Sequence, residues 1–318
     1  MKAVKDIVNA LKGFAMGAAN VVPGVSGGTI ALISGIYEEL VDALNAIMSP
    51  ETWRTLVKEG FGAFWKKIHG RFLLFLLIGV AASIFSLAKI VEEALERNPI
   101  HVWAFFFGLI IASAFFMLRD IKGWKAKDIA ITAAGAVLGL AVCTLSPTTT
   151  PDSMWFIFIC GAIAICTMIL PGISGSFILV IFGKYDYIME AVSEMNIPVL
   201  LVFALGCIIG ILAFAKFLHW LLGRWERQTM LVLIGFVIGS LIKVWPWYDM
   251  NSCARAQMIR TNLLPAQLLE GDSADFALDI FKEMGLEMDL QIPGAVLWCL
   301  AGIIVIIIIE LLGRKTAK

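Results

Sequence analysis

The segment Pro23-Gly24-Val25-Ser26-Gly27 recurs 148 residues later as Pro171-Gly172-Ile173-Ser174-Gly175. Five further pairs match at the same offset: Ile30 with Ile178, Gly35 with Gly183, Tyr37 with Tyr185, Glu38 with Asp186, and Ala43 with Ala191. Each copy interrupts an otherwise apolar stretch, and Pro-Gly breaks a helix. Matched helix breaks in two halves of one chain are typical of membrane transport sites.

The composition predicts a membrane protein. Of 318 residues, 60% are hydrophobic and only 16% are charged, which is more apolar surface than a soluble domain can bury. The net charge is zero, so nothing indicates a nucleic-acid partner. The six cysteines form no Cys-x-x-Cys pair, only Cys253 lies in a polar loop, and the three histidines are scattered. We therefore expect no disulfide, metal or other cofactor.

Six apolar stretches are long enough for a transmembrane helix, which needs about 20 residues. They cover 72–91, 101–118, 129–146, 198–221, 229–246 and 293–312. The two stretches with the Pro-Gly copies, 13–42 and 155–191, are each either one kinked span or a re-entrant hairpin of two half-helices.

The positions of Lys and Arg favour the hairpins. With two hairpins and a cytoplasmic N-terminus, the inner segments hold seventeen basic residues and the outer loops four. With two full spans, nine basic residues lie inside and twelve outside. Cytoplasmic loops carry the excess of positive charge, so we predict re-entrant hairpins and two cytoplasmic termini.

Each half then contains one hairpin and three spans. Because three is odd, the second half enters the membrane from the opposite face, which predicts two inverted repeats in an all-α polytopic protein. The first repeat is 1–150, with its hairpin at 4–42. The second is 151–318, with its hairpin at 155–191 and a long outer loop at 247–291.

A second set of matches, at an offset of 127, supports the duplication. It pairs Gly79 with Gly206, Ala88 with Ala215, Lys89 with Lys216, Gly108 with Gly235, and Ser113 with Ser240. Charge within apolar segments suggests function. We therefore expect Lys89 and Lys216 to contact substrate, although each is near enough to a span end to snorkel. Glu38, Asp186 and Lys184 are candidates for coupling or charge balance.

The motif itself predicts an anion site. In each copy a half-helix is expected to start at about Ser26 or Ser174, leaving free N–H groups that favour phosphate. Glycines allow a ligand to approach the backbone closely. The hydroxyls of Ser26, Thr29, Ser174 and Ser176 can bind anionic oxygens, or they can simply cap the helices.

The stretch Gly17-Ala-Ala-Asn20-Val-Val-Pro23-Gly24-Val-Ser26-Gly27-Gly28-Thr29 closely resembles the signature of a bacterial membrane family whose members are called PopT. The second copy, Leu170 to Ser176, is also similar. This resemblance implies a translocase that recycles undecaprenyl phosphate, or a related polyprenyl phosphate, across the cytoplasmic membrane by alternating access. The implied phosphate site comprises Asn20, Pro23, Gly24, Ser26, Gly27, Gly28, Thr29, Pro171, Gly172, Ser174, Gly175, Ser176, Lys89 and Lys216. Membrane lipids are further expected partners, and a homodimer stays open.

Two other functions fit part of the pattern. A small-anion channel or ion-coupled carrier would use the same helix ends. A membrane polyprenyl pyrophosphate phosphatase would need an acid, base or nucleophile beside the phosphate. No His or Glu lies within either Pro-Gly-x-Ser-Gly loop, which disfavours an enzyme.

Overall fold

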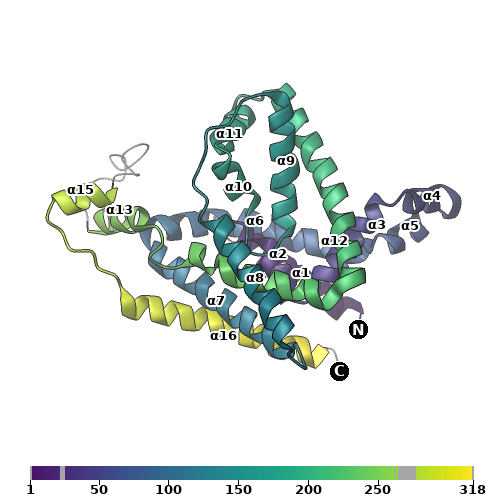
Figure 1. The fold of residues 1–318 in the computed structure, drawn as a ribbon, viewed down its shortest axis with the longest axis horizontal. Coiled ribbons are helices and arrows are strands. Elements are labelled where there is room, and N and C mark those ends of the chain that lie inside the picture. Colours follow the sequence, from purple (N-terminus) through teal and green to yellow (C-terminus); the bar gives the residue numbers. More distant parts are fainter. Residues whose placement is uncertain (1, 22–25, 262, 264–276, 317–318) are drawn as a thin grey trace. The chain divides into compact units, whose positions relative to one another are not determined.

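A computed structural model describes residues 2–21, 26–261, 263 and 277–316, and these residues form helices and no strand (Figure 1). The all-α prediction is confirmed. The helices are α1 (Lys2–Val21), α2 (Gly27–Ile33), α3 (Tyr37–Met48), α4 (Pro50–Glu59), α5 (Phe61–Lys67), α6 (Gly70–Arg97), α7 (Pro99–Asp120), α8 (Ala126–Cys143), α9 (Met154–Ile169), α10 (Gly175–Ile181), α11 (Tyr185–Ser193), α12 (Ile197–Ser240), the 3₁₀-helix η1 (Leu241–Val244), α13 (Met250–Arg260), α15 (Ala277–Glu283) and α16 (Ile292–Thr316).

Four segments in the described part of the chain are long and apolar enough to cross a membrane: Gly70–Leu87, Pro99–Asp120, Ala126–Cys143 and Ile197–Val244. Two shorter helical segments, Met154–Ile169 and Ile292–Ile308, are also apolar. All six predicted spans therefore fall mainly on helices, and the chain is a helical membrane protein.

The predicted spans 198–221 and 229–246 are joined in one element, α12, which bends at Trp225. The backbone of Trp225 is non-helical, with φ −140° and ψ 50°. The Thr229 hydroxyl donates to the Trp225 carbonyl at 2.8 Å, so a side chain satisfies a backbone group at the break. Figure 1 shows the two arms of α12 running in different directions.

The helices form two compact units, and each unit draws on both predicted repeats. The first contains residues 1–85 and 121–240, and the second contains 86–120 and 241–318. Within the first unit, α12 packs against α8 and α9, and within the second, α7 packs against α16. Compactness thus divides the chain differently from sequence similarity.

Local structure repeats at the motif offset of 148. α2 and α10 have seven residues each, and α3 and α11 begin 148 residues apart. The turn after each short helix places a glycine in the left-handed region, with φ +67° at Gly35 and +61° at Gly183. A side chain there would be strained, so both copies need glycine.

Close helix contacts repeat as well. In several helix pairs a glycine lies directly against a backbone carbonyl, where an added Cβ would collide with the oxygen. In the α1–α6 pair, Gly13 meets Leu76 and Gly79 meets Ala10; in the α9–α12 pair, Gly161 meets Phe203 and Gly206 meets Phe158. Adding 148 to the α1 positions and 127 to the α6 positions of the first pair gives the α9 and α12 positions of the second pair. Small residues at such positions are the usual way in which membrane helices pack tightly.

The remaining helices repeat the same packing. In the α7–α16 pair, Gly108 meets Cys299 and Gly302 meets Phe105; in the α8–α12 pair, Gly235 meets Thr132 and Gly135 meets Val232. Here α16 corresponds to α8 at an offset of 167, and α7 corresponds to the second arm of α12 at 127. Each pair therefore joins one helix from each predicted repeat.

The described part of the predicted outer loop 247–291 is folded. Met258 and Ala254 of α13 pack on Phe281 and Ala277 of α15 in a small core. Cys253 is 4% exposed, although the sequence places it in a polar loop. Burial raises the pKa of its thiol to about 12. Cys253 lies on the buried face of α13. The mean polarity of the whole loop does not show which face of a helix is buried.

Candidate phosphate site

The first motif copy is capped by its own serine. Pro23 and Gly24 lie outside the described residues. Ser26 is the N-cap of α2, and its hydroxyl accepts a hydrogen bond from Gly28 N at 3.1 Å. The Asn20 side chain accepts from Gly27 N at 2.7 Å, and Thr29 N donates to Ser26 O at 3.0 Å. The N–H groups of Gly27, Gly28 and Thr29 are therefore bonded within the first motif stretch, so these three are not free as expected.

The two copies contact one another directly. The Ser26 hydroxyl lies 3.2 Å from the Leu170 carbonyl oxygen, to which it donates, and Gly172 N donates to the Thr29 hydroxyl at 2.7 Å. Ser26 and Thr29 are each 1% exposed. Residues 143 to 144 positions apart in the chain are thus joined by buried polar contacts, which hold the second loop in place.

Glycines permit this contact. A Cβ on Gly28 would lie 2.5 Å from the Ile169 carbonyl oxygen, and one on Gly172 would lie 2.7 Å from the Ser240 hydroxyl. Gly172 also has φ +96°, a conformation that favours glycine. The adjacent Pro171 is buried. The second Pro-Gly loop is therefore fixed both by its own backbone and by the first copy.

The second copy keeps its polar groups open. Ser174 is the N-cap of α10 and accepts from Phe177 N at 3.2 Å. Its hydroxyl lies 3.1 Å from that of Ser176, which is exposed, and Ser174 itself is half-buried. Within the described residues, Gly175 N and Ser176 N form no hydrogen bond. Two hydroxyls and two amides therefore remain available as donors to an anion.

The matched copies thus differ in role. Hydroxyls of the first copy bond to the backbone of the second, whereas the hydroxyls of the second copy bond to one another. At seven residues, α2 and α10 are shorter than the expected half-helices and carry little macrodipole. The groups that can bind an anion here are therefore individual N–H and O–H donors rather than the dipoles of long helices.

The three candidate lysines have different surroundings. Lys184 is 3% exposed, and its ammonium donates to Thr150 O and Asp152 Oδ1, both at 2.7 Å. Lys89 is exposed and belongs to the second unit, whereas both motif copies belong to the first. Lys216 is exposed and lines a cavity that includes no motif residue.

The acidic candidates occupy matching positions at helix starts. Glu38 lies in the first turn of α3 and Asp186 in the first turn of α11, and both are exposed. Acidic residues are favourable there because they complement the helix N-terminus.

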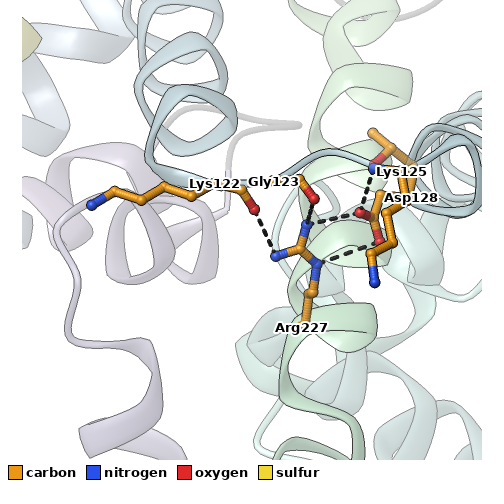
Figure 2. A network of polar contacts seen from close by, with 6 residues as sticks. Lys122, Gly123, Lys125, Asp128 and Arg227 are labelled. Carbon is orange, nitrogen blue, oxygen red and sulfur yellow. Dashed lines mark hydrogen bonds and ion pairs between the residues drawn. The ribbon is translucent and has the colours of Figure 1, made fainter.

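Sequence reasoning missed the polar network beside the α12 bend (Figure 2). The Arg227 guanidinium donates to the carbonyls of Lys122 and Gly123 at 3.0 and 3.1 Å, and to Asp128 Oδ2 at 2.7 Å. Asp128 also accepts from Lys125 N at 3.0 Å. Arg227 therefore ties the bend to the start of α8. The sequence shows it only as one of many inner basic residues, because its partners are 99 to 105 positions away.

Known proteins identify the family. The model of the undecaprenyl phosphate translocase-like family matches residues 16–261. A polyprenyl-phosphate transporter of Vibrio cholerae is 42% identical over 261 residues, which are 80% of this chain and 84% of the relative. One of Staphylococcus aureus is 33% identical over 263 residues, 77% of this chain and 88% of the relative. No solved structure matches. The family resemblance in the Pro-Gly motif is thus confirmed, and the chain belongs to the undecaprenyl phosphate translocase-like family.

Proposed function

We propose that this protein translocates undecaprenyl phosphate, or a related polyprenyl phosphate, across the bacterial cytoplasmic membrane for reuse of the lipid carrier. Family membership supports the substrate, since two relatives are named polyprenyl-phosphate transporters. The apolar helices suit a substrate whose chain stays in lipid while its head crosses. The observation that carries the mechanism is the contact between the two motif copies.

The phosphate binds, in this proposal, on the open side of the second copy. Ser174 and Ser176 donate through their hydroxyls, and Gly175 and Ser176 donate through their amides. Ser26 and Thr29 do not contact the phosphate in this proposal. They hold the second Pro-Gly loop in place by hydrogen bonds to its backbone, which preorganises these donors. A preorganised site lowers the cost of moving the charged head away from water.

Alternating access follows from two inverted repeats with re-entrant hairpins and cytoplasmic termini. The repeated glycine contacts support this arrangement, because equivalent helices pack alike in both halves. The equal element lengths of α2 and α10 support equivalent hairpins. Rocking of one half against the other then exposes the phosphate site to each leaflet in turn.

Transport without hydrolysis is the expected activity. A nucleophilic serine needs an adjacent base. In the described residues, the partners of Ser174 are the Ser176 hydroxyl and the Phe177 amide, and the partners of Ser26 are backbone groups. None of these accepts a proton as a general base would.

Reconstituted liposomes test the function directly. Undecaprenyl phosphate is placed in the membrane, and leaflet exchange, phosphate release and chloride flux are measured on the same preparation. We expect exchange with neither of the other two activities. Chloride flux without exchange would contradict the lipid substrate, and released phosphate would indicate an enzyme.

A double variant, Ser174→Ala with Ser176→Ala, tests the site. It removes both open hydroxyls, and we expect exchange to fall at least about tenfold, as two lost charge-assisted hydrogen bonds would cause. Ser193→Ala is the matched control, because among the described residues the hydroxyl of this serine bonds only to the Glu190 carbonyl within α11. Equal exchange by the double variant and the control would exclude these hydroxyls from phosphate binding.

A further inference from the structure

A second group of anion-binding side chains surrounds a separate cavity. The cavity, of about 560 Å³, lies where the end of α3 and the start of α4 face the first arm of α12. Its lining includes Asn45, Ser49, Lys216, His219, Trp220 and Arg224. This size is within the ordinary range of small-ligand sites.

The charge in this lining is positive. Lys216 and Arg224 are both exposed, and within the described residues neither forms an ion pair. No Asp or Glu lines the cavity. The adjacent carboxylate of Asp42 is occupied by His219, whose Nδ1 lies 2.8 Å from it. Two cations, an amide and a hydroxyl thus line one cavity beside an acid that is already paired with His219, which matches a phosphate monoester with its charge of −1.5 to −2 near neutral pH.

A row of aromatic rings runs along the same arm of α12 as these cations. The ring centroids of Phe214 and Phe217 are 6.2 Å apart, those of Phe217 and Trp220 are also 6.2 Å apart, and those of Trp220 and Trp225 are 5.3 Å apart. Phe217 is 50% exposed and Trp220 is 53% exposed. This arm of α12 is apolar enough for a membrane span, so its exposed rings are suited to contact with lipid chains.

We propose that this cavity is a second binding site for the substrate lipid, in which Lys216 and Arg224 bind the phosphate monoester while Phe217 and Trp220 hold the first isoprene units. The proposal rests on the proposed function and adds a second phosphate site to it, distinct from the motif site. A free anion would need the cations but not the rings. The exposed rings therefore favour a lipid phosphate over inorganic phosphate.

Photolabelling tests where the lipid binds. The probe is a short isoprenyl phosphate with a photoreactive group on its chain, added to the reconstituted protein, and labelled peptides are identified by mass spectrometry. We expect label within residues 214–225, displaced by undecaprenyl phosphate but not by an equal concentration of inorganic phosphate. Label from the corresponding isoprenyl alcohol should be at least about tenfold weaker, because the alcohol lacks the charge-assisted contacts. Equal labelling by alcohol and phosphate would overturn the proposal, as would displacement by inorganic phosphate.

Variants separate this site from the motif site. Lys216→Gln with Arg224→Gln should reduce label in 214–225 about tenfold, whereas the control Lys125→Gln with Lys127→Gln, which removes the same charge elsewhere, should not. Ser174→Ala with Ser176→Ala should keep the label and lose leaflet exchange. If wild-type protein is labelled but exchanges no lipid, the proposed function fails and this site stands. If the Lys216–Arg224 variant is labelled like wild type while exchange is intact, this inference fails alone.

Discussion

Buried hydroxyls at single positions decide how the two motif copies fit together. Thr29 provides the acceptor for Gly172 N, and both groups are buried. Thr29→Val keeps the shape but leaves that N–H unpaired, and an unsatisfied buried donor costs about 1–3 kcal/mol. We expect the free energy of unfolding in detergent to fall by that amount. Ser176→Ala is the control, since an exposed hydroxyl should change stability by less than about 0.5 kcal/mol. Equal stability of both variants would show that the contact between copies is dispensable.

The division of roles between these hydroxyls could not be read from the sequence. The spacing predicted that helices begin after Ser26 and Ser174, and both serines are N-caps. Local capping depends on neighbouring residues, so a repeated motif predicts it well. The hydrogen bond that Gly172 N donates to the Thr29 hydroxyl depends on tertiary packing, which gives two similar loops different partners. Similarity alone therefore predicted two equal halves of a site.

Helix pairs are held at short range by glycines, and the repeat predicts equal sensitivity at matched positions. Gly79 and Gly206 lie against the Ala10 and Phe158 carbonyls, so Gly79→Ala and Gly206→Ala should each destabilise the protein by about 1–3 kcal/mol through overpacking. Gly62→Ala is the control, because no described residue beyond its chain neighbours and its own helix backbone lies within 4 Å of the added Cβ. There the better helix propensity of alanine should stabilise α5 by up to about 1 kcal/mol. Chemical unfolding in detergent measures the free energy of unfolding of all three variants. A Gly206→Ala variant as stable as wild type, together with a destabilised Gly79→Ala variant, would contradict equivalent packing.

At the scale of the whole molecule, hydropathy predicted the spans, whereas their pairing needed the structure. Each predicted repeat contains three spans, yet α7 packs on α16 and α8 packs on the second arm of α12. Hydrophobic length reports that a helix can cross the membrane, but it carries no information about its neighbour. The break at Trp225 falls between the predicted spans 198–221 and 229–246, where the sequence is polar, so the two arms of α12 match two predicted spans.

Orientation in the membrane is the remaining whole-molecule prediction. Lys67, Lys122 and Lys282 are exposed, and the charge distribution places the first two inside and the third outside. A membrane-impermeant maleimide applied to intact cells should therefore label Lys282→Cys and neither Lys67→Cys nor Lys122→Cys, while all three should be labelled after lysis. Native Cys253, predicted on the outer side, should stay unlabelled at pH 8. Burial raises its pKa to about 12 and leaves almost no thiolate at that pH. Label on Lys67→Cys in intact cells would place this residue outside. It would contradict the re-entrant first hairpin and, with it, the proposed inversion of the repeats.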